Sequence, residues 1–342
     1  IHTKNFSERR KRKESDKSTN TMHILITGYT GLIGRNLLKL LSSEEFIGDE
    51  IITEVTLADV IYTHVSLPMT SFVVGKKKVD ITSDDPRSVE ELFYSRPDII
   101  FHLACSSKEE HFNFDQEHRV NVNGTKNMLD AIRAIPGYSP RFFFASSISA
   151  SNPSSAEPQD SHETQNAIAE RLISEYSQEG FVDGISLRLP TVVGHPNPKA
   201  SGRTAASFFS RIIKGHIIAS PKATAENLLR VANLTSRQLP TSRIMNMPGI
   251  TLAGHEIIEA VNHVAGERVV KLIHQERDNC KWNTKPRWPQ NIDTNNALSL
   301  NFVPDKSIEA TVKSYIEDHL NQRKSCLHLR GSFKRQLSGM TA

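Results

Sequence analysis

Three glycines spaced three residues apart, directly after a short apolar run, constrain the fold more than any other feature of the chain. The run extends from His23 to Thr27, and the glycines are Gly28, Gly31 and Gly34. Apolar residues at helical spacing follow, so the segment predicts a buried strand, a tight turn and a helix. Gly28 permits the sharp turn, Gly31 lets a phosphate approach the backbone, and Gly34 lets the helix pack closely on the strand. The amides and the dipole at the start of the helix favour an anion.

A second apolar segment, residues 55–59, ends in the carboxylate of Asp59, 25 residues after Gly34. A Rossmann fold places the acid that binds the adenosine ribose hydroxyls at this point. No basic residue follows Asp59 directly, so NAD is favoured over NADP as the cofactor. The alternative is that Asp59 is a solvated acid in a loop.

Strand-like and helix-like stretches alternate through residue 190, which predicts an α/β fold with a doubly wound parallel sheet. Further strands are expected at residues 71–74, 97–104, 141–147 and 184–190, and helices at residues 85–95, 121–132 and 163–176. Pro86 suits the first turn of the helix that begins near Asp85.

The alternation is looser beyond Pro190, and the pattern there predicts a smaller mixed α/β lobe. Helices are expected at residues 205–215, 223–234, 253–265 and 306–319, with short strands at residues 243–247 and 268–273. We therefore predict a basic tail at 1–21, an NAD-binding Rossmann domain at 22–190, a substrate lobe interleaved with it at 191–322, and a second basic tail at 323–342. A lobe over the carboxyl edge of a sheet is a usual way to form a cleft.

The formal net charge of +4 is concentrated at the two ends of the chain. Residues 1–21 hold seven Lys/Arg against three acids, and residues 323–342 hold five against none, so the body between them is mildly acidic. Binding to nucleic acid would depend on the tails alone and is not expected. Acids interrupt the first tail and no apolar segment follows it, so neither a secretory signal nor a transit peptide is predicted.

The composition of the chain also bears on its cellular compartment and on whether it binds a metal ion. The three cysteines lie far apart, which favours a reducing, cytoplasmic environment and no metal site. Apolar runs such as residues 142–145 are too short to span a bilayer, so no membrane association is expected. His111 and His118, near Asp115, could share a helical face, but a solvated helix surface accounts for them.

Several polar residues follow the predicted strands, at the edge where ligands bind in such sheets. Asp80 could meet the adenine amino group or could be a turn residue. The segment Ala104 to Ser106 would border the cofactor, whereas His102 is expected to be a hydrogen-bonded strand residue. Asn121 is a poor helix former inside a predicted helix, which indicates a side chain used for bonding.

Taken together, these residues resemble the extended short-chain dehydrogenase/reductases, also called NAD-dependent epimerase/dehydratases. The matching features follow the family's order along the chain. They are the glycine turn, Asp59, Asp80-Ile81, His102-Leu103-Ala104, Asn121-x-x-Gly124-Thr125, Ser146-Ser147 and Leu187-Arg188-Leu189-Pro190. The segments 181–184, 188–191, 207–210 and 247–249 look like the D-erythronate dehydrogenase subgroup, which oxidises a four-carbon sugar acid with NAD.

The resemblance implies a cofactor site, a small sugar-acid substrate and a homodimer. The implied NAD-binding residues are Gly28, Thr30, Gly31, Leu32, Ile33, Gly34, Asp59, Asp80, Ile81, Leu103, Ala104, Asn121 and Pro190. Relatives commonly dimerise through two long helices, which correspond here to residues 112–135 and 163–178.

The family's catalytic pair is a tyrosine and, four residues later, a lysine that lowers the phenol pKa from about 10. Ser147 matches the serine that steadies the substrate oxygen. His162 stands in the place of the tyrosine and Asn166 in that of the lysine, and no Tyr-x-x-x-Lys occurs in the chain. His162 is either a working base, because histidine titrates near neutral pH, or a surface histidine.

Two segments on the substrate side are shorter than in relatives: the loop between Ser147 and His162, and the segment between Gly215 and Pro221. Three hypotheses stay open. The protein is an NAD-dependent sugar-acid oxidoreductase acting through Ser147 and His162, a catalytically impaired dinucleotide-binding protein of the same fold, or a relative of the nucleotide-sugar epimerases and dehydratases.

Overall fold

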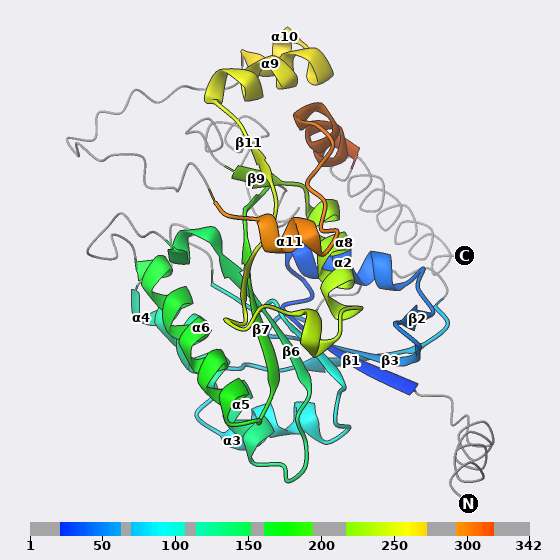
Figure 1. Ribbon diagram of the computed structural model, residues 1–342, viewed down its shortest axis with the longest axis vertical. Helices are drawn as coiled ribbons and strands as arrows, with labels where there is room; N and C mark the ends of the chain where they lie inside the picture. The colour runs from blue at the N-terminus through cyan, green and yellow to red at the C-terminus, as the bar shows by residue number, and fades with distance from the viewer. Residues whose placement is uncertain are drawn as a thin grey trace, which may run out of the picture.

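A mostly parallel β-sheet forms the centre of the computed structural model, which describes residues 21–62, 70–106, 114–151, 161–193, 217–271 and 292–317 (Figure 1). Its strands are β1 (Thr21–Thr27), β2 (Phe46–Ile47), β3 (Glu50–Asp59), β4 (Val73–Lys78), β5 (Ile99–His102), β6 (Arg141–Ser147), β7 (Asp183–Leu189) and β10 (Ile244–Asn246). Except for Thr21, both predicted basic tails lie outside the described residues.

The strand order is the one that a doubly wound sheet requires. From one edge to the other it runs β10, β7, β6, β5, β1 and β3, and β4 pairs with β3. All of these pairs are parallel, and the short β2 pairs antiparallel with the start of β3. The predicted Rossmann-type sheet is therefore confirmed.

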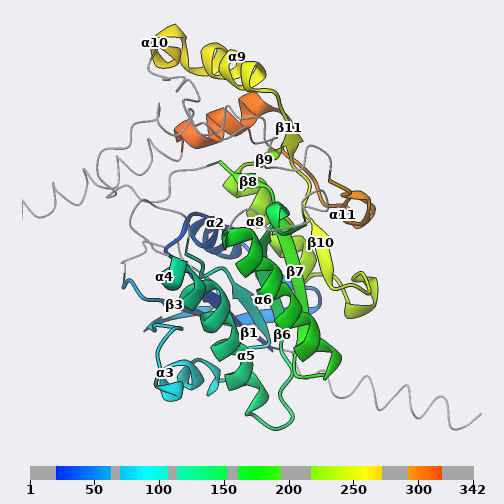
Figure 2. The ribbon, with the colours of Figure 1, turned by 90° about the vertical axis from the view of Figure 1, so that its left-hand side faces the viewer.

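Helices cover both faces of the sheet because successive strand residues point to opposite sides. Ile24 and Ile26 of β1 belong to the core shared with α2 (Leu32–Leu41) and α8 (Pro221–Ala232). Leu25 belongs to the core on the other face, below α3 (Pro86–Glu90), α5 (Thr125–Arg133) and α6 (Ser161–Gln178). Figure 2 shows α5 and α6 side by side on that second face.

Local sequence signals set where two of these helices begin. The Asp85 side chain accepts a hydrogen bond from the backbone N–H of Arg87 at 3.1 Å, directly before Pro86, which confirms the predicted start of α3. Ser220 caps α8 in the same way by accepting from the N–H of Ala223 at 3.0 Å.

A smaller lobe follows from the carboxyl end of β7. Its sheet consists of β8 (Thr191–Val192), β9 (Ile217–Ala219) and β11 (Ile250–Thr251), and it packs with α9 (Gly254–Ala265) and the helical residues 308–317. The lobe has a separate core, made by Val193, Ile218, Ile257, Val261, Val312 and Tyr315. Figure 1 shows this lobe above the main sheet.

Three expectations about the second half of the chain differ from the structure. The strand predicted within residues 243–247 joins the main sheet as β10, and the helix predicted at 223–234 packs against α2 as α8. The prediction of a strand at 268–273 was wrong, because residues Glu267–Val270 form the helix α10. Gly266, with a φ of 84°, turns the chain back so that these residues pack as a helix on α9, and this contact overrides the strand preference of Val269 and Val270.

Short elements complete the described chain. They are η1 (Glu91–Phe93), α4 (Phe114–His118), the π-helical turn η2 (Arg119–Gly124), η3 (Ile148–Ser151), η4 (Ser236–Gln238) and α11 (Asn295–Ser299). The helix predicted at 205–215 lies outside the described residues.

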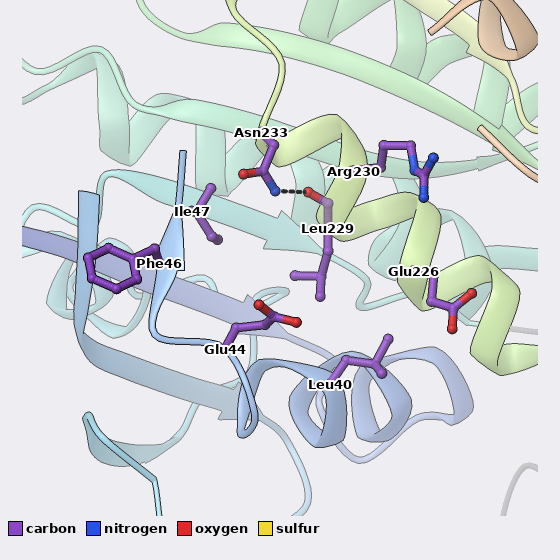
Figure 3. Close-up of a pocket in the computed structure, with 8 residues that line it drawn as sticks. All are labelled: Leu40, Glu44, Phe46, Ile47, Glu226, Leu229, Arg230 and Asn233. Carbon is purple, nitrogen blue, oxygen red and sulfur yellow. Dashed lines mark hydrogen bonds between the residues drawn. The ribbon is translucent and has the colours of Figure 1, made fainter. Parts of the chain in front are cut away.

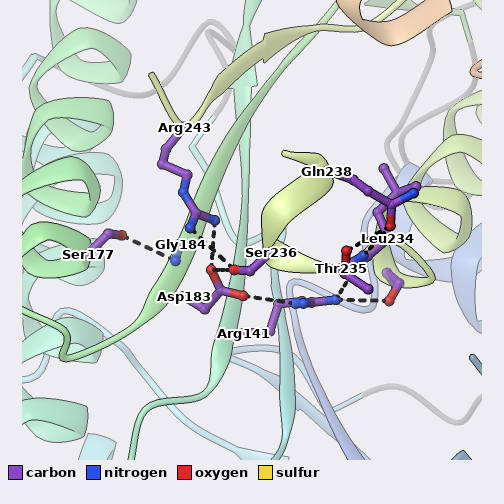
Figure 4. A network of polar contacts seen from close by, with 10 residues as sticks. Arg141, Ser177, Asp183, Gly184, Leu234, Thr235, Ser236, Gln238 and Arg243 are labelled. Carbon is purple, nitrogen blue, oxygen red and sulfur yellow. Dashed lines mark hydrogen bonds and ion pairs between the residues drawn. The ribbon is translucent and has the colours of Figure 1, made fainter. Parts of the chain in front are cut away.

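One half-buried carboxylate ties the start of β7 to the segment that leads into β10 (Figure 4). Asp183 Oδ1 accepts from Arg243 Nη1 at 2.7 Å and from the hydroxyl of Ser236, and Oδ2 accepts from Arg141 Nε at 3.2 Å. Burial raises the pKa of Asp183, but the hydrogen bond from Ser236 and the two guanidinium charges outweigh it and lower the pKa below 3.8.

We expect Asp183→Asn to lower the free energy of unfolding by about 2 kcal/mol near neutral pH, because two guanidinium groups lose a charged acceptor. The stabilisation is complete above the unfolded pKa and is lost as pH falls through the lower folded pKa. Urea denaturation should therefore show a difference between wild type and variant that shrinks below about pH 4. Glu175→Gln, at the exposed Arg171–Glu175 pair, is the control and should cost at most about 0.5 kcal/mol. Equal costs for the two variants would contradict this account.

Candidate functional site

The turn after β1 depends on the absence of a side chain at Gly28. This residue has a φ of 70°, and its N–H donates to the carbonyl of Ala58 at 2.9 Å. A Cβ atom here would lie 2.6 Å from the backbone nitrogen of Ala104 and 2.7 Å from the carbonyl carbon of Leu103. The ends of β1, β3 and β5 therefore approach one another closely at this glycine.

The start of α2 depends on the other two glycines. A Cβ atom at Gly34 would lie 2.6 Å from both the carbonyl oxygen of Gly28 and the Cα of Tyr29, so the helix crosses the turn in direct backbone contact. Gly31 is exposed and occupies the N-cap position, where no side chain caps the helix. Leu32 and Ile33 follow as the first helical residues, so the amide end of α2 faces outward and fits an anionic group.

Asp59 is bonded to the glycine turn. Its Oδ2 accepts from the N–H of Thr30 at 3.1 Å and from the Thr30 hydroxyl at 2.8 Å, while Oδ1 accepts from the N–H of Ile61 at 3.2 Å. The carboxylate is thus oriented by the turn and is not a freely solvated loop acid. A diphosphate on the helix amides and a ribose on Asp59 would be neighbours, so these residues fit a dinucleotide.

The next predicted pair, Asp80 and Ile81, has mainly structural contacts. Asp80 is exposed. Its Oδ1 accepts hydrogen bonds from the N–H of Thr82 at 2.9 Å and from the Thr82 hydroxyl at 2.8 Å, as a turn residue does. The Ile81 side chain is buried beside Gly124, and its carbonyl accepts from Asn127 Nδ2 at 2.9 Å. Contact of either residue with an adenine remains a prediction.

The end of β5 is held by a buried histidine. His102 shares hydrogen bonds with the hydroxyls of Thr27 at 2.8 Å and Thr125 at 3.1 Å, and burial lowers its pKa to about 4. It is a neutral strand residue, as predicted, and it joins β1 to α5. Leu103 and Ala104 continue from it against Gly28 at the edge of the predicted cofactor site.

Asn121 uses its side chain for bonding, as its helix propensity suggested. Its Oδ1 accepts from the N–H of Ser106 at 2.8 Å, and its Nδ2 donates to Gln165 Oε1 at 2.8 Å and to the Ser106 carbonyl at 3.3 Å. It lies in the π-helical turn η2, and all three residues are buried. Asn121 therefore links the segment after β5 to α6, and a direct role in binding cofactor stays a prediction.

Ser147 lies at the carboxyl end of β6, in register with Leu189. Its oxygen accepts from the Ser149 hydroxyl at 2.9 Å and from the Ser149 N–H at 3.3 Å. Because these bonds use the acceptor side of Ser147, its own O–H can be donated to another oxygen. Pro190, the next predicted site residue, is buried between β7 and β8 near Gly249.

A buried ion pair fixes the strand that carries Ser147 against α6. Glu170 accepts from Arg188 Nε at 2.8 Å and Nη2 at 2.7 Å, and its Oε1 also accepts from the Ser146 hydroxyl at 2.6 Å. Only 4% of the Glu170 side chain is exposed. This two-pronged contact among β6, β7 and α6 sets the spacing between Ser147 and the start of α6.

His162 and Asn166 lie in the first turns of α6, which contacts η3 just beyond Ser147. His162 is partly buried and Asn166 is 5% exposed. Asn166 Nδ2 donates to the backbone carbonyl of His162 at 2.9 Å, so its side chain bonds within its own helix. Since an amide carries no charge, Asn166 cannot replace the electrostatic effect of a lysine.

Sequence reasoning missed the residues that position this edge. Glu170 could have been found from its spacing. It lies four residues after Asn166 and eight after His162, so it shares their helical face. Thr125 was part of the Asn121-x-x-Gly124-Thr125 pattern, whereas Gln165 carried no signal, since its contact depends on which helices become neighbours.

A cavity of about 410 Å³ lies elsewhere on the protein, between α2, β2 and α8 (Figure 3). Its lining residues are Leu40, Glu44, Phe46, Ile47, Glu226, Leu229, Arg230 and Asn233. It borders the carboxyl end of α2, about 15 Å along the helix from the glycine turn, so it is separate from the site above.

Metal and membrane features are not found in the described ranges. No group of three His, Cys, Asp or Glu residues there could hold a metal ion, and His111 lies outside those ranges. None of the helices described has the length and apolar character needed to cross a membrane.

The fold and the glycine turn define an α/β protein of the dinucleotide-binding class, and comparisons with known proteins specify the family. The family model described as "NAD dependent epimerase/dehydratase family" matches residues 24–235. D-erythronate dehydrogenase from Cupriavidus necator is 30% identical over 87% of this chain and 98% of its own. The protein of the same name from Haemophilus influenzae is 28% identical over 86% and 99%.

Solved structures agree with these matches. The nucleoside-diphosphate-sugar epimerase from Agrobacterium tumefaciens aligns with a TM-score of 0.76 and 32% identity over 88% of this chain and 95% of its own. L-threonine 3-dehydrogenase from Trypanosoma brucei, at 20% identity and a TM-score of 0.65, shares the fold over 87% of this chain and 96% of its own. The chain belongs to the NAD-dependent epimerase/dehydratase family, whose cofactor is a nicotinamide dinucleotide.

Proposed function

We propose that this protein is an NAD-dependent oxidoreductase that acts on a four-carbon sugar acid such as D-erythronate. The observation that carries the cofactor half of the proposal is the Asp59 carboxylate, held by Thr30 at the glycine turn. A carboxylate in this place suits the ribose hydroxyls of NAD. The substrate half is supported by two D-erythronate dehydrogenases that match nearly over their whole length.

Each residue near the substrate has one task in this proposal. When bound, NAD supplies the hydride acceptor. Ser147 donates a hydrogen bond from its hydroxyl to the substrate oxygen, and the imidazole of His162 accepts the proton that leaves the substrate hydroxyl as the carbonyl forms. Glu170 and Arg188 keep Ser147 at a constant distance from α6.

The proposal predicts that the protein binds NADH and reduces NAD when D-erythronate is added. NADH binding is measured by its fluorescence and turnover by the appearance of NADH. L-threonine serves as a control substrate, because its dehydrogenases share the fold, and should give no turnover.

Two results would redirect the proposal. Binding of NADH without turnover of any sugar acid would favour a dinucleotide-binding protein with little catalysis, as Asn166 bonded within its own helix suggests. Turnover of a nucleoside-diphosphate sugar instead would favour an epimerase function, as in the name of the 32% identical protein from Agrobacterium tumefaciens. Failure to bind NADH would contradict the proposal itself.

We expect the double variant His162→Tyr, Asn166→Lys to raise kcat by at least about 10-fold, because a lysine lowers the pKa of a tyrosine one helical turn away. The single variant His162→Tyr is the matched control and should gain less, since a phenol with a pKa near 10 stays protonated at neutral pH. Unchanged rates in the double variant would show that the shortened loops, rather than the missing pair, limit activity.

The protein is also expected to form a homodimer through its two long helices, residues 112–135, which include α4, η2 and α5, and residues 163–178 of α6. These helices contact each other and expose Phe114 (59%) and Ile168 (37%). Light scattering should report twice the chain mass, and Ile168→Asp should shift it toward the monomer. Leu298→Asp changes a residue of α11 that is 47% exposed and should leave the mass unchanged. A monomeric wild type would contradict this expectation.

A further inference from the structure

The sheet brings a lysine next to the ribose-binding end of the predicted cofactor site. In the parallel pairing of β3 with β4, Asp59 is in register with Lys78. Neighbouring strands lie about 4.8 Å apart, so the two side chains start from adjacent positions. Lys78 lies 19 residues after Asp59 in the chain. It is therefore not the basic residue directly after the acid that would indicate NADP in the sequence.

The alternation of side chains along β4 shows which face Lys78 occupies. Val55 and Val74 are register partners, and both belong to the core on the α2 side of the sheet. Lys78 is four residues after Val74 and therefore shares that face with Asp59. The intervening Lys77 points the other way, where its Nζ donates to the carbonyl of Glu91 at 2.5 Å.

A second cation is bonded to the turn that holds Asp59. The guanidinium of Arg35, in the first turn of α2, donates to the carbonyl of Thr30, the same residue whose N–H and hydroxyl bind Asp59. Lys78 is exposed, and no ion pair occupies its ammonium in the part of the chain that the structure describes. The carboxylate that is expected to bind the ribose hydroxyls therefore has an exposed lysine at the register position beside it.

We propose that Lys78 determines cofactor specificity by making the ribose end of the site tolerant of a 2′-phosphate, so that the protein binds NADPH as well as NADH. The inference rests on the proposed dinucleotide site and concerns the choice within it. Asp59 favours NADH by binding the ribose hydroxyls. The Lys78 ammonium attracts the dianionic 2′-phosphate of NADPH and so reduces the difference between the affinities for the two cofactors.

The test is fluorescence titration of NADH and NADPH into the wild-type protein and single variants. Lys78→Gln should weaken NADPH binding by about fivefold and change NADH binding by less than about twofold, since one partly screened ion pair is removed. Lys76→Gln is the matched control, because Lys76 shares the face and the edge strand but pairs with Leu57, further from Asp59. It should leave both affinities unchanged.

Asp59→Asn gives an independent check. It should strengthen NADPH binding, and adding Lys78→Gln should remove that gain. If Lys78→Gln altered neither affinity or both equally, Lys78 would only protect the edge strand, and this inference would be overturned while the proposed function stood. Failure of the wild type to bind NADH would overturn both.

Discussion

The contact of Gly28 with the backbone of Leu103 and Ala104 is the constraint on which the rest of the site depends. A side chain at Gly28 would need space that backbone atoms occupy at 2.6–2.7 Å, so β1 and β5 could not end together. The same turn brings Thr30 to Asp59 and starts α2 with its amides outward. Several kinds of interaction, namely a steric one, a hydrogen bond and a helix dipole, therefore converge on one short segment.

Much of this arrangement could be predicted from sequence because it depends on local signals. The glycine spacing, the acid at Asp59 and the apolar runs predict the turn, its partner and the doubly wound parallel sheet that the structure shows. The signals failed where tertiary packing decides. Val269 and Val270 favour a strand by propensity, but they form a helix that packs on α9. The strand β10 pairs with β7 and so belongs to the main sheet rather than to the smaller lobe. The proximity of Lys78 to Asp59 exists only once β4 pairs with β3.

The two halves of the site differ in how closely they keep the family's pattern. On the dinucleotide side, all three glycines are present, the backbone packs closely at Gly28 and Gly34, and Asp59 is bonded to the turn by Thr30. On the side of the proposed proton transfer, Glu170 binds both Ser146 and Arg188 and so joins α6 to β6 and β7. The resemblance predicts that His162 and Asn166 occupy the positions of the family's tyrosine and lysine, and that substitution remains a prediction. The structure thus supports cofactor binding more directly than it supports catalysis.

Hydrogen exchange of the backbone amides with and without NADH tests the central claim most directly, because it reports where the dinucleotide lies without requiring turnover. The account predicts slower exchange at residues 29–35, in the glycine turn and the start of α2, and at residues 59–62 after β3. Protection confined to other segments, or no protection at saturating NADH, would contradict it.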